Sequence, residues 1–138
     1  MKTIFEQIIE RTIPAHIVYE DELVIAFLDI TQATEGHTLV VTKEPYPSIF
    51  EVPESVISHL FMIVKKLSLG LKKAFDLKGL NILNNNGPVA GQTVFHYHVH
   101  LIPRYQKDEV QFKLNNHMAN LDSERYKKRA AMIIAALS

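Results

Sequence analysis

The sequence lacks cysteine entirely over its 138 residues. Disulfide bridges and zinc sites built on thiolates are therefore excluded. A charge surplus is also missing, because 15 lysines and arginines balance 15 aspartates and glutamates. Without a net positive field, nonspecific binding to nucleic acid or to an anionic membrane is not expected. A small phosphate ligand is still compatible with this balance, since it needs only a local site.

Long apolar runs are absent too. No stretch approaches the ~20 residues that a membrane-spanning helix needs. Glutamates interrupt the apolar residues of the opening "MKTIFEQIIERT", which is unlike a signal peptide. We therefore expect a cytoplasmic protein. The length, and the lack of any repeat or linker, predict a single domain over residues 1–138.

The spacing of apolar residues predicts an α+β fold. Helices are expected over 3–10, from Pro53 to about Phe75, and over 123–137 with Ser123 as N-cap. Strands are expected over 16–21, 23–29, 37–43, 79–85 and 93–104, the last one stopping at Pro103. Short turns between neighbouring strands favour an antiparallel sheet that the helices cover.

The segment "HYHVHLIPR", residues 96–104, places His96, His98 and His100 at every second position. Side chains alternate between the two faces of a strand, so the three imidazoles are expected on one face, about 7 Å apart. The residues between them, which are expected to pack against a helix on the other face, are Tyr97, Val99 and Leu101. The pattern thus separates a chemical face from a packing face.

Three interpretations of this histidine row are open. The first is a solvated polar face that happens to contain histidine. The second is a metal site, because His-x-His on a strand is a common ligand pair and His37 offers a remote ligand. The third is catalysis, because imidazole serves as nucleophile or as general acid and base near neutral pH. The upstream loop "NNNGPVAGQT" favours the third, since its glycines, amides and hydroxyl suit an anion site.

These residues resemble the histidine triad (HIT) family of nucleotide hydrolases and transferases, whose pattern is His-φ-His-φ-His-φ-φ with φ hydrophobic. "HYHVHLI" fits at every position, and "TIFEQIIERTIPAHIVYEDE", "AFLDI", "GHTLVV" and "NNGPVAGQTVFHYHVHLIPR" follow the family's order. The resemblance covers about residues 3–105 and leaves out the C-terminal tail and helix, 106–138. It implies a HIT-like fold with a five-stranded antiparallel sheet and two main helices, extended to ten strands across a homodimer.

The resemblance also implies roles for individual residues. His98 would be the nucleophile that attacks the α-phosphate of a nucleotide and forms a nucleotidyl-histidine. His100 would orient it, while His96 and His37 would line the phosphate site and complete a relay. The residues implied for the substrate are Gln92 and Thr93 at the phosphate and leaving group, Asn85 at phosphate and ribose, Asp29 at the ribose hydroxyls, and Ile4, Phe5, Ile8, Ile13, Phe27 and Ile30 around the base.

The implied activity is hydrolysis of nucleoside phosphoramidates or dinucleoside polyphosphates, with release of a nucleoside monophosphate such as a purine nucleotide and without a cofactor. Three alternatives remain: a nucleotide-binding or scaffold protein with little physiological turnover, a metalloenzyme ligated by the triad, and a nucleotidyl transferase.

One departure from the family concerns metal. Many relatives carry a CxxC pair near the N-terminus that helps to bind a structural zinc, whereas this sequence has Thr3 and Glu6 at those positions. No metal is expected there, and the N-terminus must be ordered by packing. His16 and His59 fall outside the motif and are interpreted as surface residues, and His117 receives no role.

Overall fold

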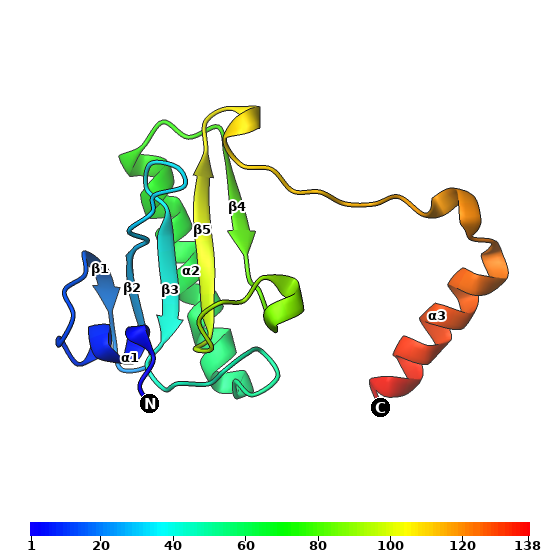
Figure 1. The fold of residues 1–138 in the computed structure, drawn as a ribbon, viewed down its shortest axis with the longest axis horizontal. Coiled ribbons are helices and arrows are strands. Elements are labelled where there is room, and N and C mark those ends of the chain that lie inside the picture. The colour runs from blue at the N-terminus through cyan, green and yellow to red at the C-terminus, as the bar shows by residue number, and fades with distance from the viewer.

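The computed structural model describes residues 1–138 and contains an open five-stranded antiparallel sheet with the strand order β1-β2-β3-β5-β4 (Figure 1). The strands are β1 (Ile17–Glu20), β2 (Val24–Leu28), β3 (Thr38–Thr42), β4 (Gly79–Leu83) and β5 (His98–Arg104). The helices are α1 (Ile4–Ile9), α2 (Glu54–Ala74) and α3 (Ser123–Ala136), with 3-10 turns η1 (Pro88–Ala90), η2 (Lys107–Glu109) and η3 (Met118–Asn120). The α+β class and the antiparallel sheet expected from the sequence are confirmed.

The long helix α2 covers one face of the sheet (Figure 1). Its apolar stripe follows three- and four-residue steps, and it places Leu60, Ile63 and Val64 against the sheet. The other buried members of this cluster are Tyr97, just before β5, and the sheet residues Val24, Ala26, Val40, Val99 and Leu101. The alternation predicted for residues 97–101 is therefore confirmed, with the apolar members toward α2. No helix in the chain combines the length and the apolar character needed to cross a bilayer.

The short helix α1 packs on the opposite face. Phe5 and Ile8 from α1 form a second buried cluster with Ile25, Phe27, Leu39 and Val41 of the sheet. Thr3 and Glu6 begin this helix with reciprocal hydrogen bonds, Glu6 N–H to Thr3 Oγ1 and Thr3 N–H to Glu6 Oε1, each 3.0 Å. A cap of this kind stabilises a helix by about 1 kcal/mol. Packing thus orders the N-terminus as expected, and the cap assists it.

Strand β5 differs at both ends from the sequence expectation. It begins at His98 and not near residue 93, because Tyr97 N–H donates to Tyr46 O (2.6 Å) and the chain bends at His96. At the other end the strand continues through Pro103. The neighbouring β3 begins at Thr38, opposite Leu101, so the missing N–H of Pro103 removes no hydrogen bond on that side.

The terminal helix α3 contradicts two expectations. Its N-cap is Asp122, whose side chain accepts from Arg125 N–H, and Ser123 is the first helical residue. It does not cover the sheet: the tail leads it away from the body (Figure 1), and every residue from 122 to 138 is exposed. Both sheet faces already carry a helix, α2 on one and α1 on the other.

His59 is not a free surface residue. It is half-buried on α2, and its Nε2 lies 2.6 Å from Asp21 Oδ2, which also accepts from the Tyr19 hydroxyl at 2.7 Å. Burial alone would raise the pKa of Asp21, but these hydrogen bonds and two backbone N–H groups hold it well below its usual range. This contact ties α2 to the turn between β1 and β2.

Candidate active site

A cavity of about 550 Å³ lies on the sheet face that carries α1. Its walls come from α1, the segment between α1 and β1, the end of β2, β3, the loop before β5, and β5 itself. The expected site residues that line it are Ile4, Phe5, Ile8, Ile13, Phe27, Asp29, Ile30, Asn85, Thr93, His98 and His100. The sequence reasoning therefore found most of the cavity, with an apolar wall and a polar end.

His98 is buried at the polar end, only 7 % exposed, and the Phe5 ring stands edge-on to it at 4.9 Å. Its Nδ1 lies 2.7 Å from His96 O. A carbonyl oxygen can only accept, so Nδ1 carries the proton, and in the neutral ring Nε2 keeps its lone pair. Burial lowers the pKa of His98, and the bond to His96 O opposes this in part. The ring is therefore a neutral base or nucleophile at physiological pH.

His96 does not line the cavity, contrary to the role expected for it. It is fully buried, with Nε2 2.7 Å from Thr42 O and Nδ1 2.8 Å from Thr3 Oγ1. Because the bend at His96 ends the regular alternation, its ring joins α1 to β3 instead of facing the ligand space. Its carbonyl nevertheless orients His98, so its contribution to the site runs through the backbone.

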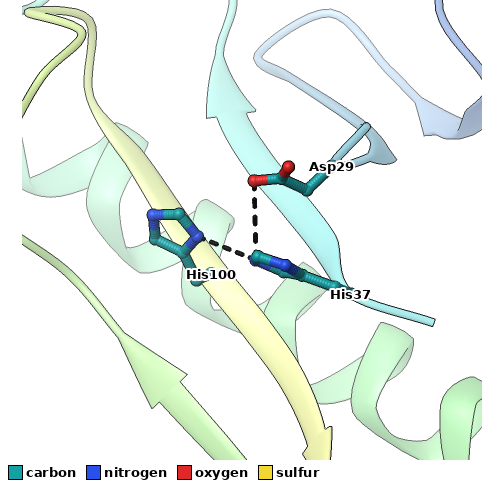
Figure 2. A group of neighbouring side chains, drawn as sticks. All are labelled: Asp29, His37 and His100. Carbon is teal, nitrogen blue, oxygen red and sulfur yellow. Dashed lines mark hydrogen bonds and ion pairs between the residues drawn. The ribbon is translucent and has the colours of Figure 1, made fainter. Parts of the chain in front are cut away.

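His37 likewise lies behind the cavity and not in its wall. Its Nε2 is 3.0 Å from His100 Nδ1 and 3.6 Å from Asp29 Oδ2 (Figure 2). His100 lines the cavity next to His98, with 5.2 Å between the ring centroids. The structure thus places His37 against His100, one ring behind the cavity wall, and its expected role at the phosphate stays a prediction. The relay expected from the resemblance has a geometric basis in this pair.

Burial keeps the remaining imidazoles neutral as well. It lowers the pKa of His100 to about 4, with help from the neighbouring His98 and His37. The pKa values of His37 and His96 are also lowered by burial, although Asp29 opposes the shift at His37. At Asp29 burial would raise the pKa, but hydrogen bonds from the Thr31 hydroxyl and amide lower it overall.

Gln92 was expected to contact phosphate, and the structure places it elsewhere. It is buried, with Oε1 accepting from Gly87 N–H and Nε2 donating to Pro47 O and Val94 O. Three backbone partners use its carboxamide, so it shapes the loop before β5. The loop also depends on Gly87 and Gly91, both at φ 94°, a left-handed conformation that disfavours a side chain. Thr93 and Gly91 remain in the cavity wall.

Two polar residues at the site were not predicted from the sequence, His16 and Asn84. His16, interpreted as a surface residue, is exposed but lines the cavity just before β1. Asn84 donates from Nδ2 to His98 O at 2.9 Å and so anchors the backbone of the buried ring. The "NNN" run marks this loop as unusual, but nothing in it separates Asn84 from Asn85. No periodicity distinguishes His16, because it precedes the strand.

Metal ligation has one candidate set of side chains. Asp29, His37 and His100 each offer a ligand atom, and these atoms lie within 4.8 Å of one another (Figure 2). Only one member of the histidine row belongs to this set, so the row does not form a metal site by itself. Thr3 and Glu6 are committed to capping α1 and to His96. Neither side chain provides the thiolate of the family's structural zinc site.

The lowered pKa values of the four histidines His37, His96, His98 and His100 predict that the fold weakens in mild acid. Below the unfolded value of about 6.5 the unfolded chain takes up protons that the buried rings resist, so stability falls as pH decreases. Folding lowers the pKa of His100 to about 4. This residue alone should therefore reduce the free energy of unfolding by about 1–2 kcal/mol between pH 7.5 and pH 5. Urea unfolding at pH 7.5, 6 and 5 measures it, and His100→Asn should flatten the dependence. A midpoint that stays constant or rises toward pH 5 would contradict the assignment.

Comparison with known proteins gives a consistent picture. A family profile described as the HIT domain matches residues 10–107. The Bacillus subtilis protein named "Protein hit" is 49 % identical over 106 residues, which are 77 % of this chain and 73 % of that protein. The Arabidopsis thaliana protein named "Adenylylsulfatase HINT3" is 36 % identical over 123 residues, 88 % of this chain and 62 % of that protein.

Solved structures resemble the whole chain. The crystal structure of a HIT family member from Bacillus subtilis has a TM-score of 0.95 at 41 % identity and covers 100 % of this chain and 99 % of its own. A histidine triad nucleotide-binding protein from Candida albicans has a TM-score of 0.84 at 29 % identity, covering 99 % and 97 %. The similarity therefore includes the C-terminal tail that the sequence resemblance left out.

Proposed function

The chain belongs to the HIT family, and from this premise we propose that it is a nucleotide-binding hydrolase in which His98 attacks the α-phosphate of a nucleotide. The observation that carries the proposal is the hydrogen bond from His98 Nδ1 to His96 O. It leaves the lone pair of Nε2 on a buried, neutral ring beside a cavity. Such a ring needs no further base to act as a nucleophile.

The cavity suits a nucleoside monophosphate unit. Its volume of about 550 Å³ lies within the range of small-molecule sites. The apolar wall around Phe5, Ile8 and Phe27 accepts a planar base, and Ile30 extends this wall at the rim. Asp29 can bind ribose hydroxyls with its carboxylate, as the resemblance implies. This order puts the base near α1 and the phosphate near His98.

The chemistry has two displacements. In the first, a P–N bond forms between His98 Nε2 and the α-phosphorus while the bond to the leaving group breaks, and the leaving group departs with the electron pair and takes a proton from solvent. In the second, water attacks the phosphorus and loses a proton to solvent, and the P–N bond breaks with its electron pair returning to His98 Nε2, which releases a nucleoside monophosphate. Splitting one displacement in two lowers each barrier, and His100 adds charge stabilisation at close range.

The leaving group follows from the charge of the site. No lysine or arginine lines the cavity, so the phosphate meets backbone N–H groups and neutral side chains around Gly91 and Thr93. A phosphoramidate or an adenylyl sulfate brings fewer negative charges than a dinucleoside polyphosphate. We therefore expect the first two classes to be preferred. The name of the Arabidopsis relative, an adenylylsulfatase, supports testing the sulfate among them.

A substrate panel tests the proposal. Adenosine phosphoramidate, adenylyl sulfate and a dinucleoside tetraphosphate are compared for release of adenosine monophosphate, with and without a chelator. Turnover that resists chelation and favours one of the first two supports the hydrolase. Negligible turnover with micromolar nucleotide binding favours the binding-protein alternative. The Candida relative is named a nucleotide-binding protein, which agrees with that alternative. Chelator-sensitive turnover favours the metalloenzyme, whose ligands would be Asp29, His37 and His100.

We also propose that the protein is a homodimer whose C-terminal arm, residues 111–138, packs on a second copy. Large apolar residues of α3 are exposed, among them Met132 (64 %), Ile134 (66 %) and Leu137 (81 %). A free amphipathic helix of this length is marginal in water. The similarity to the Bacillus subtilis crystal structure extends over the full chain, which supports a defined position for the arm. The outer edge of β4 is unpaired, as a sheet continued into a second copy requires.

Truncation of the arm tests this assembly. We expect the full chain to elute at twice its 15.8 kDa and the chain shortened to residues 1–110 to shift to the monomer mass, because the arm's apolar contacts are lost. Light scattering after gel filtration measures the mass. Ile82→Glu on β4 separates a sheet contact from an arm contact, and Val18→Glu on β1, at the opposite edge of the sheet, is the matched control with a similarly exposed side chain. A monomeric full chain at micromolar concentration would contradict the proposal.

A further inference from the structure

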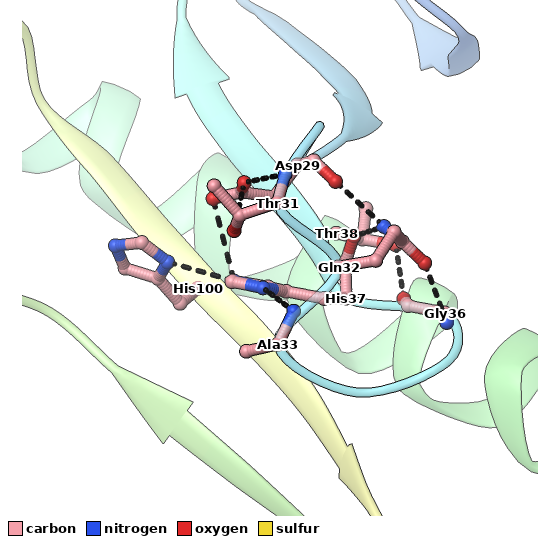
Figure 3. A network of polar contacts seen from close by, with 8 residues as sticks. All are labelled: Asp29, Thr31, Gln32, Ala33, Gly36, His37, Thr38 and His100. Carbon is pink, nitrogen blue, oxygen red and sulfur yellow. Dashed lines mark hydrogen bonds and ion pairs between the residues drawn. The ribbon is translucent and has the colours of Figure 1, made fainter. Parts of the chain in front are cut away.

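The loop between β2 and β3, residues 29–37, is held by one carboxamide (Figure 3). Gln32 Nε2 donates to Asp29 O and to His37 O, both at 2.7 Å, and its Oε1 accepts from Gly36 N–H at 2.9 Å. Gln32 itself has φ 44°, a left-handed conformation that is uncommon for a residue with a side chain. The strained backbone and the three hydrogen bonds together indicate that this side chain determines the conformation of the loop.

The loop held by Gln32 determines which ring nitrogen of His37 carries the proton. Ala33 N–H points at His37 Nδ1 with a donor–acceptor distance of 3.3 Å (Figure 3). A backbone N–H can only donate, so Nδ1 holds a lone pair and the proton of the neutral ring is on Nε2. Asp29 Oδ2, 3.6 Å from Nε2, favours the same tautomer by its charge. Its other oxygen is fixed by Thr31, through N–H at 2.8 Å and the hydroxyl at 2.7 Å.

The tautomer of His37 then sets that of His100. His37 Nε2–H donates to His100 Nδ1 at 3.0 Å, so the proton of neutral His100 is on its Nε2, the nitrogen remote from His37 (Figure 2). His100 lines the cavity, where an N–H can donate to a phosphate oxygen or to the leaving group. With the opposite tautomers, His100 would present a lone pair there and repel an anion.

We propose that Gln32 is a positioning residue: its carboxamide holds the loop so that Ala33 fixes the tautomer of His37 and, through it, makes His100 a hydrogen-bond donor to the substrate. The chain of contacts runs from Gln32 through the backbone of Asp29 and His37 to the ring of His100. The catalytic use of this donor rests on the proposed function. The tautomers of His37 and His100 are argued from the hydrogen bonds alone.

Gln32→Glu tests the hydrogen bonds of the Gln32 carboxamide to the loop, because the new side chain has the same shape and keeps an acceptor for Gly36 N–H. It loses both donors and sets a carboxylate oxygen against the carbonyls of Asp29 and His37. Gln106→Glu makes the same chemical change on an exposed side chain outside the arm and the cavity, and it serves as the control. Long-range ¹H–¹⁵N spectra of the imidazoles report each tautomer, with signals assigned from His37→Asn and His100→Asn.

In the unmodified protein, both His37 and His100 should carry the proton on Nε2. In Gln32→Glu, His37 should shift toward the Nδ1–H form, and kcat on the best substrate of the panel should fall about 10- to 100-fold with KM changed less than about threefold. A wild-type spectrum with the proton of His37 on Nδ1 overturns the proposal, even if Gln32→Glu fails to fold. Unchanged tautomers in a folded Gln32→Glu variant also overturn it.

The outcome for the activity is separate. If no member of the panel is hydrolysed by the wild-type protein, the proposed function fails while the spectra still decide the tautomers. If the panel is hydrolysed and the tautomers are wrong, the hydrolase stands and Gln32 is only a structural residue of the loop.

Discussion

Replacement of His98 by alanine or asparagine is expected to lower kcat by at least about 10⁴-fold, because the nucleophile of the first displacement is lost. Nucleotide binding should survive, since the apolar wall, Asp29 and the loop before β5 are untouched. Single-turnover kinetics and calorimetric titration with adenosine monophosphate measure the two quantities separately. We expect the dissociation constant to change less than about tenfold.

The matched control for this variant is His117→Ala. His117 is an exposed histidine of the arm, so its loss should leave the rate unchanged. His98→Asn additionally keeps a polar group of similar size beside His96 O, which limits rearrangement of the buried pocket. If His98→Asn turned over substrate within tenfold of the unmodified protein, His98 could not be the nucleophile.

The largest effect on stability is expected at Gly36. This residue has φ 94°, and a Cβ there would lie 3.0 Å from Phe75 Cε2 and 3.3 Å from Pro103 Cγ. Gly36→Ala therefore combines an unfavourable backbone conformation with overpacking, for a loss of about 2–4 kcal/mol. In a chain of this size the melting temperature should fall by about 10 °C. The loop that carries His37 would be displaced as well.

Gly70→Ala is the matched control, with the opposite sign expected. Gly70 lies inside α2, and a Cβ there would meet nothing within 4 Å. Alanine is the better helix former, so this variant should gain about 0.5–1 kcal/mol. Thermal unfolding of both variants under identical conditions gives the comparison. Equal melting temperatures for the two variants would show that the local geometry of Gly36 is not limiting.

The sequence predicted the fold and the place of His98 beside the cavity because both depend on local patterns. Alternation at residues 97–101 specifies which face of β5 meets α2, and the spacing along residues 54–74 specifies the stripe that α2 buries. The position of α3 could not be obtained this way, since its apolar residues require a partner but do not say which surface provides it. The prediction that β5 stops at Pro103 was wrong for a related reason: whether a proline is tolerated there depends on where β3 begins.

The finer roles of polar residues could not be predicted because they depend on contacts distant in sequence. His96 forms a hydrogen bond with Thr3, and Gln92 forms one with Pro47. Both side chains therefore lie outside the cavity wall, although the motif predicts that they face it. Spacing gives the side of a strand that a residue faces, but a bend of the chain before His98 changes that direction. His16 reaches the cavity by a connection that carries no periodic signal.

Covalent capture of the substrate on His98 is the most direct test of the proposed function. The protein is mixed with the preferred adenylate substrate, quenched at alkaline pH to preserve the acid-labile P–N bond, digested, and analysed by mass spectrometry. The proposed mechanism predicts an added adenylate mass on the peptide that contains His98, and none in His98→Asn. Turnover without that added mass, under a quench that preserves a synthetic phosphohistidine standard, would contradict it.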